Sequence, residues 1–282
     1  MHRPLTAGVA LRRHWPEYLI EGWALGMFMV SAGLATLLLE STSLPLRAMI
    51  PSAELRRVLI GLAMGLTAIL LIYSRWGQRS GAHMNPAVTL TFLLLGKVAA
   101  WDAFFYVLAQ FLGAAAGVLL VYAGAGQAFA APEVDFIVTL PGAAGAGAAF
   151  LAEVLISGLL MFTILAVANS ARYARWTGVW AGVLVAAFIV FEAPLSGMSM
   201  NPARTFASAA VAAEWQDLWI YFAAPPLGML IAAAWYRLIP TLHTIGCAKL
   251  LHPLGVRCIH CGHEPGPALR PTASAGSPIH ER

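Results

Sequence analysis

The sequence predicts an all-α membrane protein with six transmembrane helices and two re-entrant half-helices, arranged as an inverted repeat of three plus three spans. Three observations lead to this fold class. Hydrophobic residues make up 60% of the 282 residues and charged residues 11%, against about 25% charge in soluble domains. Six stretches are long and apolar, and one eleven-residue motif occurs twice. A soluble globule, a disulfide-framed secreted domain and a nucleic-acid-binding protein are thereby excluded.

The six spans come first, because a transmembrane helix needs about 20 mostly apolar residues. The expected spans are residues 18–39, 58–74, 99–123, 148–168, 177–193 and 217–238. The third and sixth open with aromatic residues that suit the membrane interface. Pairs of glycines four positions apart, as at Gly22 and Gly26 or Gly61 and Gly65, predict close contact between helices.

Positive charge predicts the orientation of these spans. With the N-terminus in the cytoplasm, 13 Lys and Arg residues lie inside and 4 outside, and short cytoplasmic loops normally hold the excess. Both termini are therefore expected in the cytoplasm of a multi-pass protein in the cell membrane. The first apolar stretch is too long for a signal-peptide core and is expected to remain as an anchor.

The chain divides into three expected parts. Residues 1–16 form a cytoplasmic segment, 17–239 a membrane domain, and 240–282 a cytoplasmic tail rich in Cys, His and Pro. Within the membrane domain the two repeats cover about 17–124 and 147–239. An odd number of spans in each half places the second half upside down relative to the first, as in many transport proteins.

The repeated motif lies after the second span of each half. Residues 80–90 recur 116 positions later at 196–206 with seven of eleven positions identical, and both copies contain Asn-Pro-Ala. Asn is a favoured N-cap and Pro a favoured first helical residue, so each motif predicts a short helix, about 85–95 and 201–211. Inversion brings the two positive helix ends together near the bilayer centre. The loops before them need protein or water around their backbone.

These paired motifs, Asn85-Pro86-Ala87 and Asn201-Pro202-Ala203, resemble the aquaporin, or major intrinsic protein, family over residues 17–239. Shorter likenesses support it: Tyr106-x2-Ala109-Gln110, Ala152-Glu153 and Trp219-Ile220-Tyr221-Phe222. The resemblance implies a right-handed six-helix bundle with a pore through each monomer, a homotetramer, and water and small neutral solutes as permeants. It implies a channel in a lipid bilayer with no enzymatic activity and no nucleic-acid partner.

Arg204 lies three positions after Asn201, on the same face of the second half-helix. An Arg so deep in an apolar chain is costly and indicates function, and the resemblance implies that it belongs to a narrow selectivity filter. The alternative is a structural Arg paired with a carboxylate. Counting back from the motifs places the other filter residues at Met64, Ile189 and Met198. A strict water channel carries an aromatic residue, a His and a small residue there, so this filter is unusually apolar.

Three residues near the motifs are expected to support the loops. Glu21 and Glu153, one in the first span of each half, would accept backbone N–H groups of the re-entrant loops. His83 is expected to be a hydrogen-bonded loop residue, or alternatively to line the pore. An ion channel or ion-coupled transporter would need further ionisable groups along its path, and the spans contain mainly these two glutamates.

Solute choice stays open between two readings. Thr205 stands where a glycerol channel carries Asp, and the small residue Ala209 also favours a water channel. The apolar filter favours a broader channel for polyols, urea, ammonia, hydrogen peroxide or undissociated metalloid acids. Water is the first expectation and the broader channel the second.

All three cysteines of the chain lie in the tail. Cys258-x2-Cys261 has half of a zinc-site spacing, and Cys247 with His263 would complete a Cys3His set. Zinc or another thiophilic metal or metalloid suits such ligands, and the tail would then sense metal or gate the protein. The alternative is a disordered tail with incidental cysteines, and no other cofactor is expected.

Overall fold

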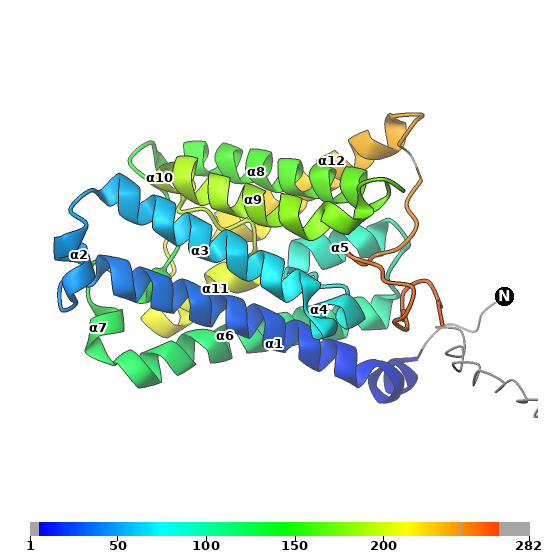
Figure 1. The fold of residues 1–282 in the computed structure, drawn as a ribbon, viewed down its shortest axis with the longest axis horizontal. Coiled ribbons are helices and arrows are strands. Elements are labelled where there is room, and N and C mark those ends of the chain that lie inside the picture. Colours follow the sequence, from blue (N-terminus) through cyan, green and yellow to red (C-terminus); the bar gives the residue numbers. More distant parts are fainter. Residues whose placement is uncertain (1–5, 243, 265–282) are drawn as a thin grey trace, which may run out of the picture.

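The computed structural model describes residues 6–242 and 244–264, which in this range form helices joined by loops without any β-strand. Six helices are long and apolar enough to cross a membrane. These are α1 (Ala7–Glu40), α3 (Ala53–Tyr73), α6 (Ala100–Ala125), α8 (Gly145–Ala168), α9 (Thr177–Phe191) together with η2 (Ala174–Trp176) directly before it, and α12 (Leu218–Leu238). They run along the long axis of the molecule and form one bundle (Figure 1).

Two short helices lie inside the bundle and enter it from opposite ends. They are α5 (Pro86–Leu94) and α11 (Pro202–Ala212), and each begins directly after the Asn of its motif. A smaller helix precedes each loop, α4 (Arg75–Ser80) in the first half and α10 (Ala193–Ser196) in the second. The remaining short helices, α2 (Pro45–Met49), α7 (Gln127–Ala130) and η1 (Asp135–Ile137), belong to the connections.

The two halves interlock rather than lying side by side. Within each half the first and third spans pack together, α1 on α6 and α8 on α12, while α3 packs on α9 across the halves. The half-helices also cross over: α11 packs on α6, and α5 packs on α12. Each half-helix is therefore held by the last span of the other half.

Glycine allows the closest of these helix contacts. A Cβ added to Gly113 on α6 would overlap the carbonyl oxygen of Gly22 on α1. Between α3 and α9, a Cβ on Gly65 would lie 2.5 Å from the Gly182 carbonyl oxygen. Small residues at such positions let helix backbones meet directly, which supplies van der Waals packing in lipid. The predicted glycine pairs thus lie at helix–helix contacts.

Helix α1 begins at Ala7, well before the expected span at residue 18, so most of the segment expected as 1–16 is helical. Pro16 lies inside the helix instead of ending it. The extension is stabilised by contacts that the local sequence does not reveal. His14 Nδ1 donates to Asp102 Oδ1 at 2.7 Å, and the Tyr18 hydroxyl donates to the same oxygen at 2.6 Å, in a buried cluster against α6.

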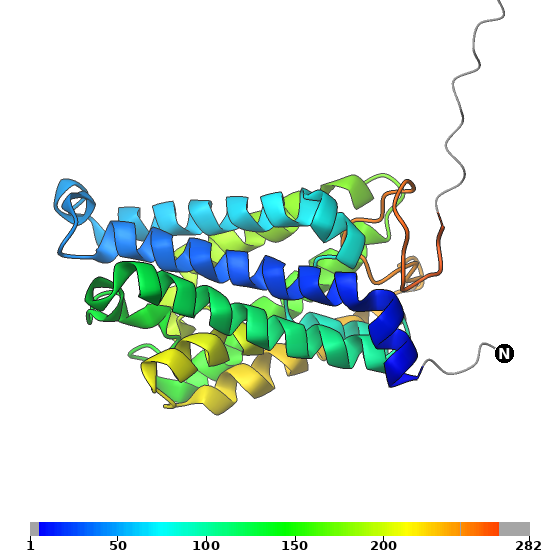
Figure 2. The same ribbon diagram turned by 90° about the horizontal axis from the view of Figure 1, so that it is seen from below.

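The described part of the tail, residues 244–264, folds back onto the bundle. It lies at the end where α1 begins and where α4 is found (Figures 1 and 2). We call this the tail end, and the opposite end, marked by α2, the α2 end. In this range the tail contains no helix or strand.

Candidate functional site

A cavity of about 450 Å³ runs through the bundle from one end to the other. Glu40 and Arg56 line it near the α2 end, and Ile72 and the tail residue Leu250 line it near the tail end. Its other walls come from α1, α3, α9 and the two loops before the half-helices. The cavity therefore follows the path that the inverted repeat predicts.

The two loops adopt the same unusual backbone. Ala82 and Met84 in the first loop have φ of 55° and 48°, and Met198 and Met200 at the matching positions have φ of 52° and 54°. A non-glycine residue with positive φ costs of the order of 1–3 kcal/mol and persists only where its surroundings impose it. Two such residues in each loop indicate that strong contacts hold both loops.

A buried carboxylate holds the first loop. Glu21 Oε1 accepts from Ser80 Oγ at 2.7 Å and from the His83 backbone N–H at 3.0 Å, while Oε2 accepts from the Met84 N–H at 2.6 Å. Gln110 Nε2 also donates to Oε2, at 2.9 Å, so that the carboxylate accepts from four donors in all. Glu21 is fully buried, so its negative charge is balanced by these donors.

Glu153 on α8 repeats this arrangement in the second loop. Its Oε1 accepts from Ser196 Oγ at 2.8 Å and from the Ser199 N–H at 2.6 Å, and its Oε2 accepts from the Met200 N–H at 2.7 Å. Glu153 is also fully buried. Both glutamates are therefore placed as the sequence predicts, each contacting two successive backbone N–H groups of its loop.

The two motif asparagines meet inside the cavity and bond across the halves. Asn85 Oδ1 accepts from the Ala87 N–H, and Asn201 Oδ1 accepts from the Ala203 N–H, so each caps its own half-helix. Asn85 Nδ2 donates to the Met200 carbonyl and Asn201 Nδ2 to the Met84 carbonyl, both at 2.7 Å. An amide carries two hydrogens, so one hydrogen of each remains for a molecule in the cavity.

Pro86 and Pro202 occupy the first position of each half-helix. At that position the missing N–H removes nothing from the helix and the fixed φ favours it. Ala87 and Ala203 follow and are fully buried. The three residues of each motif thus combine a cap, a helix start and a small, fully buried residue.

All four expected filter residues line the cavity. Met64 is 2% exposed and Met198 is 7% exposed, while Ile189 and Arg204 are half-buried. Arg204 Nη1 is buried and has no hydrogen-bond partner among the described residues, where Arg204 also forms no ion pair with a carboxylate. The guanidinium is therefore a free donor for a solute.

Several site residues escaped the sequence reasoning. The Tyr106 hydroxyl donates to the Ser80 carbonyl at 2.7 Å, and the Tyr221 hydroxyl donates to the Ser196 carbonyl at 2.6 Å. The available signal was a tyrosine near the start of the third span of each half, 115 positions apart and so close to the 116-residue offset of the motifs. Arg56 and Arg57 were expected in an outer loop, but α3 begins early enough to place both on the cavity wall. Ile60 also lines the cavity one turn from Met64.

His83 combines the two roles that the sequence left open. Its Nε2 donates to the Ala248 carbonyl of the tail at 2.8 Å, and its Nδ1 lies 3.0 Å from Thr89 Oγ1. It is 4% exposed and still contributes to the cavity wall. The carbonyl partner fixes the proton on Nε2. His83 is thus a loop residue that also contacts the tail.

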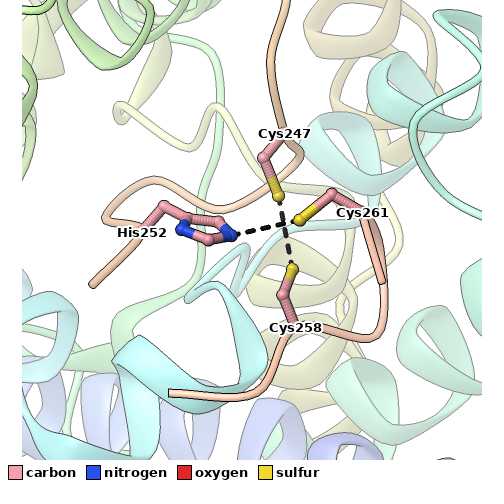
Figure 3. A group of neighbouring side chains, drawn as sticks. All are labelled: Cys247, His252, Cys258 and Cys261. Carbon is pink, nitrogen blue, oxygen red and sulfur yellow. Dashed lines mark hydrogen bonds between the residues drawn. The ribbon is translucent and has the colours of Figure 1, made fainter. Parts of the chain in front are cut away.

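The tail brings four possible metal ligands together, and one of them differs from the expectation. Cys247, Cys258 and Cys261 are joined by His252, not by His263, and Figure 3 shows these four side chains pointing toward one another. We call them the thiol–imidazole cluster. His263 Nε2 lies instead 2.7 Å from the Leu254 carbonyl oxygen and donates to it.

The cluster has specific distances between its ligand atoms. Cys247 Sγ lies 3.4 Å from Cys258 Sγ, and His252 Nε2 lies 3.1 Å from Cys261 Sγ. All three cysteines are free thiols. The hydrogen bond between the first pair raises the pKa of the Cys247 thiol and lowers the pKa of the Cys258 thiol to about 4.

A family model described as "Major intrinsic protein" matches residues 13–236. The chain belongs to the major intrinsic protein family. The matched region contains both motif asparagines, both half-helices and nearly all of the six spans. The tail cluster lies beyond that region, because its first residue is Cys247.

Relatives within the major intrinsic proteins come from plants and animals. The chain is 33% identical to "Probable aquaporin NIP7-1" of Arabidopsis thaliana over 67% of its own length, and 39% identical to "Aquaporin NIP1-2" of Oryza sativa subsp. japonica over 62%. It is 35% identical to "Aquaporin-4" of Rattus norvegicus over 64%. The matched regions span 66%, 58% and 56% of these three relatives.

A solved structure shares the fold. The aquaglyceroporin from Plasmodium falciparum superposes with a TM-score of 0.68 at 20% identity, covering 80% of this chain and 96% of that one. At this identity the likeness shows the fold alone. Six spans with two interlocking half-helices are therefore an architecture common to this chain and a distant protein.

Proposed function

We propose that this chain is a membrane channel through which water and other small uncharged solutes pass passively, while ions and protons are excluded. The observation that carries the proposal is the meeting of Asn85 and Asn201 inside a cavity that reaches both ends of the bundle. A permeating molecule exchanges its hydration for the free amide hydrogens and for carbonyls of the loops. No covalent bond is made or broken, so the proposed activity is not enzymatic.

Exclusion of cations follows from the charges around this point. Each half-helix N-terminus carries a partial positive charge of about half an elementary charge, and α5 and α11 direct both toward the cavity. Arg204 adds a full charge, and none of the ion pairs among the described residues includes it. Positive helix ends and an Arg in a pore form electrostatic barriers to cations and protons.

The composition of the filter supports water first and a wider set of solutes second. Met64, Ile189 and Met198 contribute only apolar surface beside Arg204. Methionine is flexible and adapts to the shape of its neighbour, so the two methionine side chains can change conformation to admit a solute larger than water. The filter contains no histidine donor that would favour water, so the passage of a polyol, urea or an undissociated acid is hindered little more than the passage of water.

Placement and assembly belong to the same proposal. The tail end is proposed to face the cytoplasm, because that arrangement places 13 of the 17 Lys and Arg residues inside. The lipid-facing surface carries exposed apolar side chains such as Leu155 and Phe191, as expected in a cell membrane. A homotetramer with one pore in each subunit is the proposed assembly, and no nucleic-acid partner is proposed.

Stopped-flow light scattering on proteoliposomes tests this function. Rapid shrinkage under an impermeant osmolyte, relative to empty vesicles, is expected for the wild type. Re-swelling in glycerol, urea or a neutral metalloid acid separates the broader channel from a strict water channel. Absence of any solute or water flux above that of empty vesicles contradicts the proposal, and so does an ionic current.

Two variants make the test specific to the filter. Arg204→Val is expected to admit protons or cations while water flux continues, measured with a pH-sensitive dye inside the vesicles. Ile189→His supplies a donor to the cavity that Arg204 also lines and is expected to slow glycerol and urea relative to water, whereas the volume-conserving Ile189→Leu keeps the wild-type ratio. Unaltered ion exclusion in Arg204→Val would show that Arg204 does not form the barrier.

A further inference from the structure

The thiol–imidazole cluster has the ligand set and the dimensions of a metal site. Its four ligand atoms all lie within 4.8 Å of one another, with 3.4 Å between Cys247 Sγ and Cys258 Sγ and 3.1 Å between His252 Nε2 and Cys261 Sγ. In a tetrahedral zinc site the bonds are about 2.3 Å to sulfur and 2.0–2.1 Å to nitrogen, so ligand atoms lie roughly 3.5–3.8 Å apart. Shifts of about 1 Å or less therefore produce that geometry.

A buried cation beside the cluster gives a second, independent observation. Lys249 is 2% exposed, and its Nζ donates to the carbonyls of Gln78 and Arg257, both at 2.9 Å. It forms no ion pair with a carboxylate in the described ranges 6–242 and 244–264. An unpaired buried ammonium is costly. Three thiolates and a neutral imidazole around a divalent ion carry a net charge of −1. Lys249, which donates to the carbonyl of Arg257 next to Cys258, neutralises that charge.

The tail segment needs such a cross-link because it has little regular structure of its own. Residues 244–264 contain no helix or strand, yet Cys258 and Lys249 are each only 2% exposed. Short segments without a sufficient core usually rely on a disulfide or a metal to fix their conformation. The cysteines are free thiols and are therefore available as ligands of a metal that would cross-link the segment.

The segment is joined directly to the wall of the proposed pore. The Leu250 N–H donates to the Gly81 carbonyl at 3.1 Å, and the Ala248 carbonyl accepts from His83 Nε2 at 2.8 Å. Leu250 itself lines the cavity at the tail end. Both contacts come from residues within three positions of Cys247, so the position of the ligands determines the position of Leu250.

We propose that the thiol–imidazole cluster binds one thiophilic divalent cation of the zinc class. The bound ion fixes the tail segment 247–261 against the loop that precedes α5, with Leu250 at the mouth of the cavity. Soft thiolates with one imidazole select zinc over hard cations such as Mg²⁺ or Ca²⁺. The tail is then a metal-dependent part of the channel wall.

Metal content of the full-length protein tests the site. Because the chain has three cysteines and all belong to the cluster, any thiolate-to-metal absorption band reports this site alone. The protein is purified in detergent with a non-thiol reductant, loaded with Zn²⁺, desalted and measured by elemental mass spectrometry. Co²⁺ replaces Zn²⁺ for spectroscopy. One equivalent per chain and the absorption of a tetrahedral cobalt–thiolate site are expected.

Variants separate the cluster from its surroundings. Cys258→Ser and His252→Ala are expected to weaken binding at least about tenfold, since even the loss of outer-shell partners has that effect. His263→Ala is the matched control: its ring centroid lies 5.4 Å from that of His252, but it is outside the cluster and is expected to bind one equivalent. Elution as wild type on size exclusion checks the fold. No stoichiometric metal in the wild type, or equal loss in all three variants, overturns the proposal.

Limited trypsin digestion tests the attachment of the tail. Cleavage after the buried Lys249 requires the segment to lift from the channel, whereas Arg172 and Arg175 are both exposed control sites. Slow cleavage at Lys249 in the zinc-loaded protein and fast cleavage after chelation are expected, with unchanged cleavage at the controls. Equal rates at Lys249 with and without metal would overturn the attachment. Neither readout depends on solute flux, so the site is tested separately from the proposed channel activity.

Discussion

Replacing Glu153 by Gln removes the charge that holds the second re-entrant loop and changes almost nothing in volume. The carboxylate accepts from Ser196 Oγ and the Ser199 N–H with one oxygen and from the Met200 N–H with the other. A glutamine has only one oxygen. Its best orientation keeps the first two donors and turns its own NH₂ toward the Met200 N–H, so that two donors face each other.

The cost follows from these contacts. The lost hydrogen bond to a charged acceptor is worth about 1.5–3 kcal/mol, and the buried N–H left without a partner costs about 1–3 kcal/mol. Removing a buried charge relieves part of its desolvation, so we expect a net loss of about 3 kcal/mol. For a protein of this size that corresponds to a fall in Tm of roughly 6–12 °C.

Thermal unfolding in detergent, followed through the nine tryptophans, measures this loss, and osmotic permeability measures its effect on the loop. Both are expected to fall, because Met198 and Met200 no longer have their strained backbone imposed. Glu264→Gln neutralises an exposed tail carboxylate whose ion pair with Arg257 lies at the surface and contributes little to stability, so it serves as the control for loss of a charge. A Glu153→Gln protein with the wild-type Tm and permeability would refute the reasoning that this carboxylate holds the loop.

Three further predictions concern other contacts. Gly65→Ala places a Cβ against the facing helix and is expected to destabilise the bundle by about 1–3 kcal/mol, whereas Gly124→Ala, with open space around it, is expected to be neutral or slightly stabilising; unfolding midpoints compare them. Tyr221→Phe leaves a buried carbonyl without its donor and is expected to cost about 1–3 kcal/mol in the same assay. The hydrogen bonds from Thr42 lower the pKa of Glu133 to about 2, so their stabilisation is complete above pH 4.5 and is lost as pH falls through about 2. Amide exchange at Thr42 is expected to stay slow over that interval, and fast exchange already near pH 4.5 would contradict it.

Local chemistry explains why the sequence predicts the half-helices so closely. The expected bounds 85–95 and 201–211 differ by one residue at each end from Pro86–Leu94 and Pro202–Ala212. An Asn cap followed by Pro specifies a helix start from adjacent residues alone. The loop carboxylates were likewise predictable, because a lone Glu in an apolar span must find donors.

Contacts between distant segments limit the rest of the prediction. Pro16 with Trp15 before it reads as a boundary, but His14 and Tyr18 bond to Asp102, which is more than 80 residues away. The early start of α3 has a local signal in the Ser52 cap, but the ion pair of Arg56 with Glu40, which orients Arg56 at the cavity wall, has none. Such partners leave no local pattern in the sequence.

The tail shows the same limit within a short segment. Spacing alone allows either His252 or His263 as the fourth ligand, and their rings are neighbours. The backbone decides between them: the Cys258 N–H donates to the His263 carbonyl at 2.8 Å. That bond fixes the main chain of His263 while its ring donates to Leu254, leaving His252 to face the sulfurs.

The crossed asparagine contacts also set the order in which the protein is completed during synthesis. The acceptor for Asn85 Nδ2 is the carbonyl of Met200, 115 residues further along the chain. When the ribosome has made only the first half, the amide of Asn85 has no such acceptor, and α5 still lacks α12 to pack on. The first half can therefore form the Glu21 contacts of its loop by itself, whereas the Asn85 amide and α5 reach their final partners only after the second half has entered the membrane.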